Sequence, residues 1–167
     1  MLIRKAGTED LDRILAVVNA AAEAYRGVIP ADRWHEPYMP KDELVREVSG
    51  GIAFWVAEND GRIAGVMGMQ DKGAVALVRH AYVAPATQRA GVGTALLRHV
   101  LGLTDKPVLI GTWAAAEWAI AFYRRNGFSL VPASDTPRLL RTYWSIPERQ
   151  IETSVILADQ RWIDTRR

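Results

Sequence analysis

Hydrophobic residues recur with two different periods along the chain, and these periods distinguish helices from strands. Near the N-terminus they lie three or four residues apart, as on one face of a helix, at Leu11, Ile14, Leu15 and Val18. Thr8 precedes this run, and the acidic residues Glu9 and Asp10 directly follow Thr8. We therefore expect a helix that Thr8 caps and that ends near Tyr25. Helical spacing and end signals predict three more helices, at 41–48, 92–103 and 115–126.

Short apolar runs bounded by turn residues predict the strands. Residues 52–58 and 62–69 flank Asn59-Asp60-Gly61, a sequence typical of a tight hairpin. The other runs predict strands at 2–6, 75–84, 107–113, 128–131 and 154–158. Residues 132–150 are interpreted as a long connection. Helices and strands in this order predict an α/β chain of mixed α+β type, with three antiparallel strands before the strand-to-helix turn near residue 90.

Composition is that of one ordinary globular domain. The chain has 167 residues, 49% of them hydrophobic and 24% charged, so we expect a single domain over 1–167. No apolar run reaches the length of about 18 residues that a membrane helix needs, and no signal-peptide pattern opens the chain. We therefore expect a cytoplasmic protein that does not bind membranes. The absence of cysteine excludes disulfides and a thiolate nucleophile.

Charge narrows the set of ligands. The formal net charge is +2 and no run of lysine or arginine occurs, which argues against nucleic acid as a partner. His35, His80 and His99 lack the spacing of metal ligands, so no metal site is predicted.

A glycine-rich segment, Gln88–Thr94, lies between a predicted strand that Pro85 ends and a predicted helix. A turn of this kind presents bare backbone N–H groups at the positive end of a helix dipole, which predicts an anion site suited to phosphate. It is not a P-loop, because no lysine follows Gly93, and it lacks the third glycine of a Rossmann fingerprint. The alternative is that the glycines serve only the geometry of a tight turn.

A second motif lies about thirty residues further on, at Phe122-Tyr123 and Gly127-Phe128. The glycine loop after Val-x-Pro and this second motif, in that order, resemble the acyl-CoA loop and the following helix of the GNAT (GCN5-related) family of N-acetyltransferases. The resemblance covers residues 2 to 131. It implies a central, mostly antiparallel twisted sheet of six to seven strands with a parallel splayed pair, flanked by about four helices.

The resemblance also implies a site for acetyl-CoA. Main-chain groups of the strand would pair with the pantetheine amides, and the loop would hold the pyrophosphate. The residues implied are Tyr82, Val83, Gln88, Arg89, Ala90, Gly91, Val92, Gly93 and Thr94. Many family members carry asparagine seven residues before the tyrosine, but this chain has Ala116 there, which puts one polar contact in doubt.

Tyr123 is the expected general acid, because the resemblance assigns this position a proton donor to the departing thiolate. A phenol of ordinary pKa about 10 is a suitable donor to a thiolate whose thiol has a pKa of about 8.5. The alternative is a tyrosine that only packs in the core. Because no cysteine could hold an acyl group, direct attack of the amine in a ternary complex is favoured.

The general base and the acceptor are less well defined by the sequence. His80 stands two residues before Tyr82, on the same face of a regular strand, and is one candidate base; a water chain is another. An irregular aromatic segment supplies the candidate acceptor-binding residues, Tyr25, Trp34, His35 and Glu36. For each of these residues a purely structural role is an open alternative.

The sequence thus predicts an acetyl-CoA-dependent N-acetyltransferase that acts on a primary amine of a small molecule or peptide. The alternative is a catalytically silent acyl-CoA-binding sensor or interaction module. A homodimer through the C-terminal strand is compatible with the pattern, and the sequence does not identify the amine.

Overall fold

The computed structural model describes the whole chain, residues 1–167, and divides it into two compact units. The first unit comprises 1–24, 35–71 and 78–105, and the second comprises 25–34, 72–77 and 106–167. One domain over 1–167 stays a prediction.

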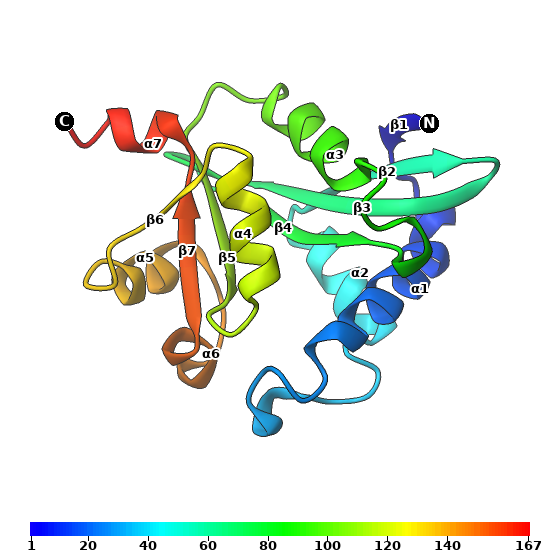
Figure 1. Cartoon of the computed structure of the whole chain (residues 1–167), viewed down its shortest axis with the longest axis horizontal. Coiled ribbons are helices and arrows are strands. Elements are labelled where there is room, and N and C mark those ends of the chain that lie inside the picture. The colour runs from blue at the N-terminus through cyan, green and yellow to red at the C-terminus, as the bar shows by residue number, and fades with distance from the viewer. The chain divides into compact units, whose positions relative to one another are not determined.

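The first unit carries an antiparallel sheet with helices on both faces (Figure 1). Its hairpin turns at Asp60 and Gly61, whose φ angles of 49° and 75° are those of a tight turn, as the sequence predicts. The elements are β1 (Leu2–Lys5), η1 (Thr8–Asp10), α1 (Leu11–Ala22), α2 (Lys41–Ser49), β2 (Ala53–Asn59), β3 (Arg62–Asp71), β4 (Ala76–Val83), η4 (Pro85–Thr87) and α3 (Val92–Leu101). The short helix η2 (Glu23–Tyr25) lies at the boundary between the units.

Neighbouring residues of β3 face opposite sides of this sheet, and each side packs against different helices. On one side Val66 joins a core with α1 and α2, through Ile14, Val17, Val18, Leu44, Ile52, Phe54 and Val56. On the other side a Cβ at Gly65 would come within 2.8 Å of Val92 and 3.0 Å of Leu96. The missing side chain therefore lets the first turns of α3 lie directly on the strand.

The second unit is built around β7, which pairs antiparallel with β5 and with β6. Its elements are η3 (Ala31–Arg33), β5 (Val108–Trp113), α4 (Glu117–Arg125), β6 (Ser129–Leu130), α5 (Thr136–Tyr143), α6 (Glu148–Glu152), β7 (Ser154–Ala158) and α7 (Gln160–Asp164). The core of this unit gathers Leu77, Leu109, Leu139, Leu140, Trp144, Ile151, Ile156 and Trp162. The helix α4 contacts β6, the strand that follows it.

The strand order is β1-β2-β3-β4-β5-β7-β6 in a seven-stranded sheet, with β4 and β5 as the parallel pair. The first two residues of β4 belong to the second unit, where the Ala76 N–H donates to the Pro107 carbonyl at 3.0 Å. The mixed α+β class, the strand number and the parallel pair predicted from the sequence are confirmed.

Two local predictions are wrong. Thr8 does not cap the first helix, because the chain first makes the short helix η1, so Gly7 is its N-cap and Asp10 is the N-cap of α1. Residues 132–150 are not a plain connection, since they contain α5 and the start of α6. The helices α5 and α6 have eight and five residues, too few for the sequence to show a helical period. Helices this short depend on packing for their stability.

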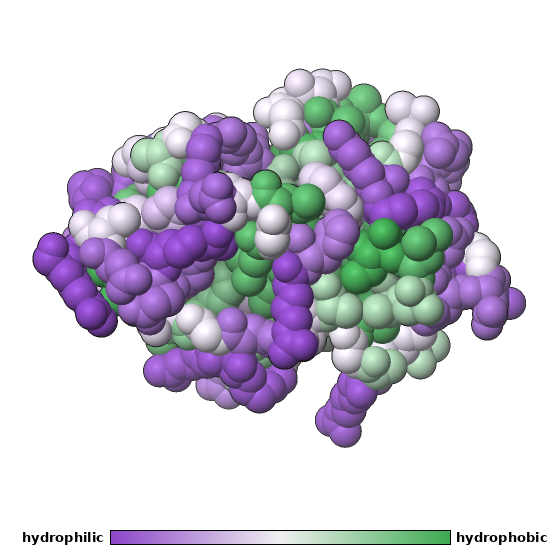
Figure 2. All heavy atoms as spheres, turned by 90° about the horizontal axis from the view of Figure 1, so that it is seen from above, coloured by the Kyte–Doolittle hydropathy of each residue, from purple (hydrophilic) through white to green (hydrophobic).

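None of the helices combines the length and the apolar character needed to cross a bilayer. In the view of Figure 2, hydrophilic side chains cover most of the face and separate the hydrophobic patches from one another.

The most buried charged group is Asp10, whose side chain has no exposed surface and stands where η1 meets α1. Its carboxylate accepts hydrogen bonds from Arg4 at 2.8 and 2.9 Å, from Arg13 at 2.6 Å and from the Gly7 N–H at 2.8 Å. Arg4 also binds Glu58 of β2 at 3.1 Å. The hydrogen bonds from Arg4, with the other donors, hold the pKa of Asp10 well below its ordinary value.

We predict that Asp10→Asn lowers the free energy of unfolding at pH 7 by about 2–4 kcal/mol, because it leaves two guanidinium groups without their buried partner. A carboxyl with a depressed folded-state pKa stabilises above its unfolded pKa of about 3.9 and loses this effect as pH falls. The difference between the two proteins should therefore shrink below pH 4 in urea titrations.

Asp42→Asn is the matched control, since it removes a carboxylate from the exposed 2.9 Å pair with Arg46. Its urea midpoint should change much less than that of Asp10→Asn, because solvent screens an exposed ion pair. An Asp10→Asn protein as stable as the wild type at pH 7 would contradict the stabilising role of this ion pair.

Candidate functional site

The segment Gln88–Thr94 of the first unit leads from β4 through η4 into α3. Arg89 and Gly91 adopt left-handed backbone conformations, with φ of 68° and 81°. Gly91 is the N-cap of α3, no side chain caps this helix, and a Cβ at Gly91 would meet no atom within 4 Å. The left-handed turns therefore leave open space above the helix end.

Two hydrogen-bonded side chains, Thr87 and Gln88, hold the segment that connects β4 to this loop. The Thr87 hydroxyl lies 3.0 Å from both the Ala64 and the Ala84 carbonyl oxygens, which joins η4 to β3. The Gln88 side-chain amide donates to the Val83 carbonyl at 3.4 Å, so it folds back over the end of β4. The loop is thus anchored on the side of the strands.

The start of α3 has backbone donors with no protein acceptor. The Ala95 N–H donates to Gly91, but no backbone carbonyl or side chain accepts from the N–H groups of Gly91, Val92, Gly93 or Thr94. Four donors at the positive end of a helix dipole favour a bound anion. The structure therefore places the predicted loop residues where their N–H groups can serve a phosphate.

Tyr123, in the last turns of α4 in the second unit, is buried with 6% of its surface exposed. Its ring makes edge-on contacts with Phe122 and Phe128, at centroid distances of 5.1 and 6.0 Å. Its hydroxyl makes no hydrogen bond to the protein. Burial, with a smaller effect from Tyr25, raises the pKa of the Tyr123 phenol above its ordinary value of 10.0. The phenol therefore stays protonated and able to donate.

The C-terminal end of α4 helps to position the Tyr123 ring. Gly127 has a φ of 89°, and the Phe128 N–H donates across it to the Tyr123 carbonyl at 3.0 Å. The Asn126 side chain donates to the Phe122 carbonyl at 2.9 Å. A left-handed glycine closed by such a bond is a helix C-cap, so Gly127-Phe128 both stops the helix and packs against Tyr123.

Two of the predicted acceptor-binding residues, Tyr25 and Trp34, lie in the second unit. Tyr25 stacks on Trp118 of α4, with centroids 5.8 Å apart, although Trp118 stays 46% exposed. The Arg26 guanidinium lies 4.7 Å above the Trp34 ring. An ion pair of 2.9 Å between Asp32 and Arg149 ties the 25–34 segment to α6.

The other two, His35 and Glu36, lie in the first unit, and both are exposed. His35 stacks on Tyr38 at 6.1 Å, and its Nδ1 donates to the Pro37 carbonyl at 2.9 Å. These contacts give His35 a local structural role.

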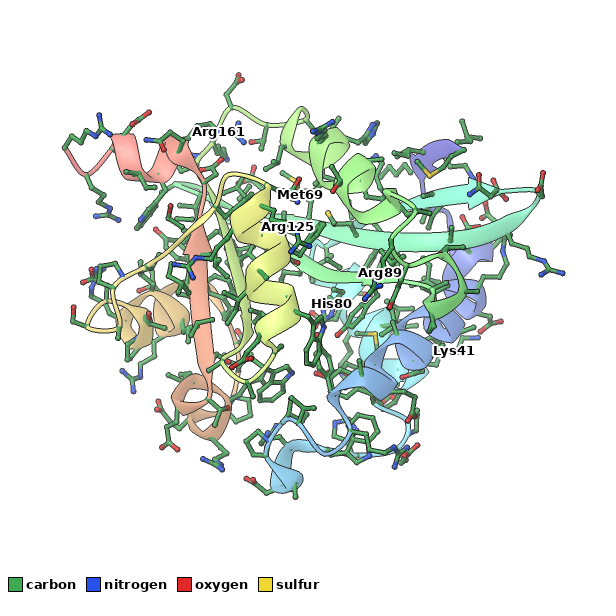
Figure 3. All side chains as sticks on the ribbon, in the orientation of Figure 1. Lys41, Met69, His80, Arg89, Arg125 and Arg161 are labelled. Atoms are coloured by element: carbon green, nitrogen blue, oxygen red, sulfur yellow. The ribbon has the colours of Figure 1, made fainter.

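His80 lies on β4, as Figure 3 shows, with a side chain that is 16% exposed. Its Nε2 is 3.0 Å from a carboxylate oxygen of Glu47, which comes from α2. Arg79 reaches the same oxygen at 3.5 Å and the Gln70 side-chain oxygen at 3.4 Å. The hydrogen bond from His80, and the charge of Arg79, hold the pKa of Glu47 below its ordinary value.

The strand is not regular at this histidine. His80 has a φ of 54°, in the left-handed region, so the alternation that puts it on the same face as Tyr82 does not apply across it. Glu47 was not among the predicted site residues. Its signal was a carboxylate one helical turn from the fully buried Leu44, on the inner face of α2.

Ala116, where many family members carry asparagine, is the fully buried N-cap of α4, and no side chain caps that helix. A side-chain contact from this position is therefore absent. No group of three or more His, Asp or Glu side chains is arranged as metal ligands would be.

The structure combines a mixed sheet with a parallel strand pair, an open glycine loop at a helix start and a buried tyrosine two elements later. These are the features that the resemblance to the GNAT acetyltransferases implies. Residues 50–130 match the family model of the acetyltransferase (GNAT) domain. Over these residues the chain is similar to a GNAT acetyltransferase domain, in agreement with the resemblance found in the sequence.

Solved structures agree on the fold. PaiA N-acetyltransferase from Thermoplasma acidophilum, in complex with coenzyme A, is 20% identical with a TM-score of 0.71, over 95% of this chain and 97% of that chain. An acetyltransferase of the GNAT family from Staphylococcus aureus Mu50 is 16% identical with a TM-score of 0.72, over 95% and 97%.

The ribosomal-protein-S18-alanine N-acetyltransferase from Escherichia coli is 18% identical with a TM-score of 0.66, over 95% of this chain and 92% of that chain. A comparison with curated protein sequences finds no match.

Proposed function

We propose that the protein is an acetyl-CoA-dependent N-acetyltransferase, acting as one domain over 1–167, that transfers an acetyl group to a primary amine of a small molecule or peptide. The observation that carries the proposal is the set of four unaccepted N–H groups at the start of α3. It gains support from the GNAT family match over residues 50–130.

The loop residues fit the diphosphate of acetyl-CoA. The N–H groups of Gly91–Thr94 are the donors, and Arg89, which is exposed, adds a positive charge beside them. Main-chain groups of Tyr82 and Val83 would pair with the pantetheine arm; the Gln88 amide already occupies one lone pair of the Val83 carbonyl. That PaiA N-acetyltransferase was solved with coenzyme A supports this assignment.

Acetyl-CoA is an activated thioester, and transfer of its acetyl group to an amine releases the thiol of coenzyme A. In this proposal Tyr123 acts as general acid, because burial keeps its phenol protonated and its hydroxyl has no protein partner. His80 is the proposed base that accepts a proton from the amine. Since the chain has no cysteine, we propose direct attack in a ternary complex rather than an acyl-enzyme.

Tyr25, Trp34, His35 and Glu36 are proposed to contact the acceptor. Support comes from the exposed carboxylate of Glu36, which suits an ammonium group. Tyr25 stacks on Trp118, which is 46% exposed and so adds accessible aromatic surface beside it.

The test of this function is thiol release from acetyl-CoA across a panel of amines: polyamines, amino acids, aminoglycosides and peptides with free N-termini. We expect release with at least one class and an acetylated product by mass spectrometry. Acetyl-CoA binding by calorimetry without release from any amine would favour a silent sensor, and absence of binding would reject both.

We predict that Gly91→Glu weakens acetyl-CoA binding by about 100-fold or more, since like charges brought together cost several kcal/mol. The measurement is isothermal titration calorimetry. Two controls separate charge from strain. Gly91→Ala has the same left-handed backbone without the charge and should bind within a few-fold of the wild type.

The second control is Gly102→Glu. It adds the same charge at the other end of α3, where a Cβ approaches backbone oxygens no closer than 3.4 Å. It too should bind acetyl-CoA as the wild type does. Full affinity in Gly91→Glu would show that the phosphates bind elsewhere.

We predict that Tyr123→Phe lowers kcat by roughly 10- to 1000-fold, on the usual scale of general acid catalysis. The affinity for acetyl-CoA should stay within about twofold, because the ring contacts with Phe122 and Phe128 remain. Tyr143→Phe is the control: Tyr143 is the last residue of α5 and is partly buried against the core of the second unit, so kcat should stay unchanged. A wild-type kcat in Tyr123→Phe would remove the acid assignment.

A further inference from the structure

The side chains around His80 form a polar cluster on three elements of the first unit. Glu47 comes from α2, Gln70 from β3, and Arg79 and His80 from β4. The exposed fractions of Glu47, Arg79 and His80 are 22%, 15% and 16%, so the cluster is largely withdrawn from water. Half-buried charged groups of this kind are more often arranged for function than surface ion pairs are.

The hydrogen bond to Glu47 fixes the tautomer of His80. A carboxylate only accepts, so the nitrogen at 3.0 Å from it, Nε2, carries the proton in the neutral ring. Nδ1 is then the nitrogen with a free lone pair, and no protein group is bonded to it. The Phe54 ring packs against the imidazole, with centroids 6.0 Å apart, and limits its rotation.

We propose that Glu47 is a positioning residue for catalysis: it holds His80 with Nδ1 free to take the proton from the acceptor ammonium. The inference rests on the proposed function and deepens it. An N–H bond of the ammonium breaks, its electron pair stays on the amine nitrogen, and the proton forms a bond to Nδ1. The imidazolium is stabilised by the Glu47 carboxylate and later returns the proton to water.

Arg79 supplies a positive charge that balances the negative charge of Glu47. Its Nη2 lies 3.5 Å from the Glu47 oxygen that His80 binds, so a fixed cation and the imidazole share one carboxylate. The other charges that act on the cluster are Glu43 and Arg46, both on α2. Glu47 is thus held ionised when His80 is neutral, which keeps it an acceptor for Nε2–H throughout the cycle.

The first experiment reads the tautomer directly by ¹⁵N NMR of labelled protein, without any substrate. Neutral His80 should show a protonated Nε2 and an unprotonated Nδ1. In Glu47→Gln this preference should weaken, and in Glu47→Asp it should be partly kept. A neutral His80 protonated at Nδ1 in the wild type would overturn the proposal.

The second experiment uses the best amine of the panel. Glu47→Gln should lower kcat about 10-fold or more, with the KM for acetyl-CoA unchanged. In the His80→Gln background the same substitution should change kcat no further, since the two residues act through one step.

Controls distinguish the proposed role of Glu47 from the proposed acetyltransferase function. Asp42→Asn removes a carboxylate from the same helix, where it forms an exposed ion pair with Arg46, and should leave the kcat unchanged. Circular dichroism must show a folded Glu47→Gln protein, and Glu47→Asp, which keeps the charge, should regain part of the rate.

A wild type that acetylates an amine while Glu47→Gln keeps the same kcat would overturn the inference alone. A wild type that acetylates none of the amines would overturn the proposed function, and the catalytic role of Glu47 with it.

Discussion

The contact between α3 and β3 at Gly65 is the constraint on which the anion loop depends. With no side chain at Gly65, Val92 and Leu96 lie directly on the strand, and both are almost fully buried. Burying two such side chains stabilises by about 3–6 kcal/mol. Because the helix is held by its apolar face, its N-terminal N–H groups need no capping side chain and remain available to a ligand.

The sequence predicts best what local chemistry determines. Asn59-Asp60-Gly61 makes a hairpin and Gly127 ends a helix because each residue type fits one backbone conformation. Contacts between distant segments are not encoded in this way: neither the Glu47–His80 pair nor the packing of α5 follows from spacing along the chain. The regular alternation assumed at His80 failed because one left-handed residue interrupts the strand.

Burial of Tyr123 has two opposing chemical effects. It raises the pKa of the phenol, which makes Tyr123 a weaker acid than a tyrosine in water. A thiolate formed in similarly dry surroundings has its basicity raised for the same reason, since both anions lose hydration. Proton transfer between them then depends on the difference between two shifted values. Phe122 and Phe128 pack against the ring of this proposed general acid and so contribute to its burial.

The aromatic segment 25–34 is tied to α6 by the Asp32–Arg149 pair, whose side chains are 56% and 46% exposed. An ion pair open to solvent weakens as salt screens it, over a Debye length of about 8 Å at physiological ionic strength. The buried contacts that hold α3 have no such sensitivity. Ionic strength should therefore act differently on the two proposed binding regions. Salt weakens the ion pair that holds the segment proposed for the amine, and it does not weaken the apolar packing that holds the loop proposed for the phosphates.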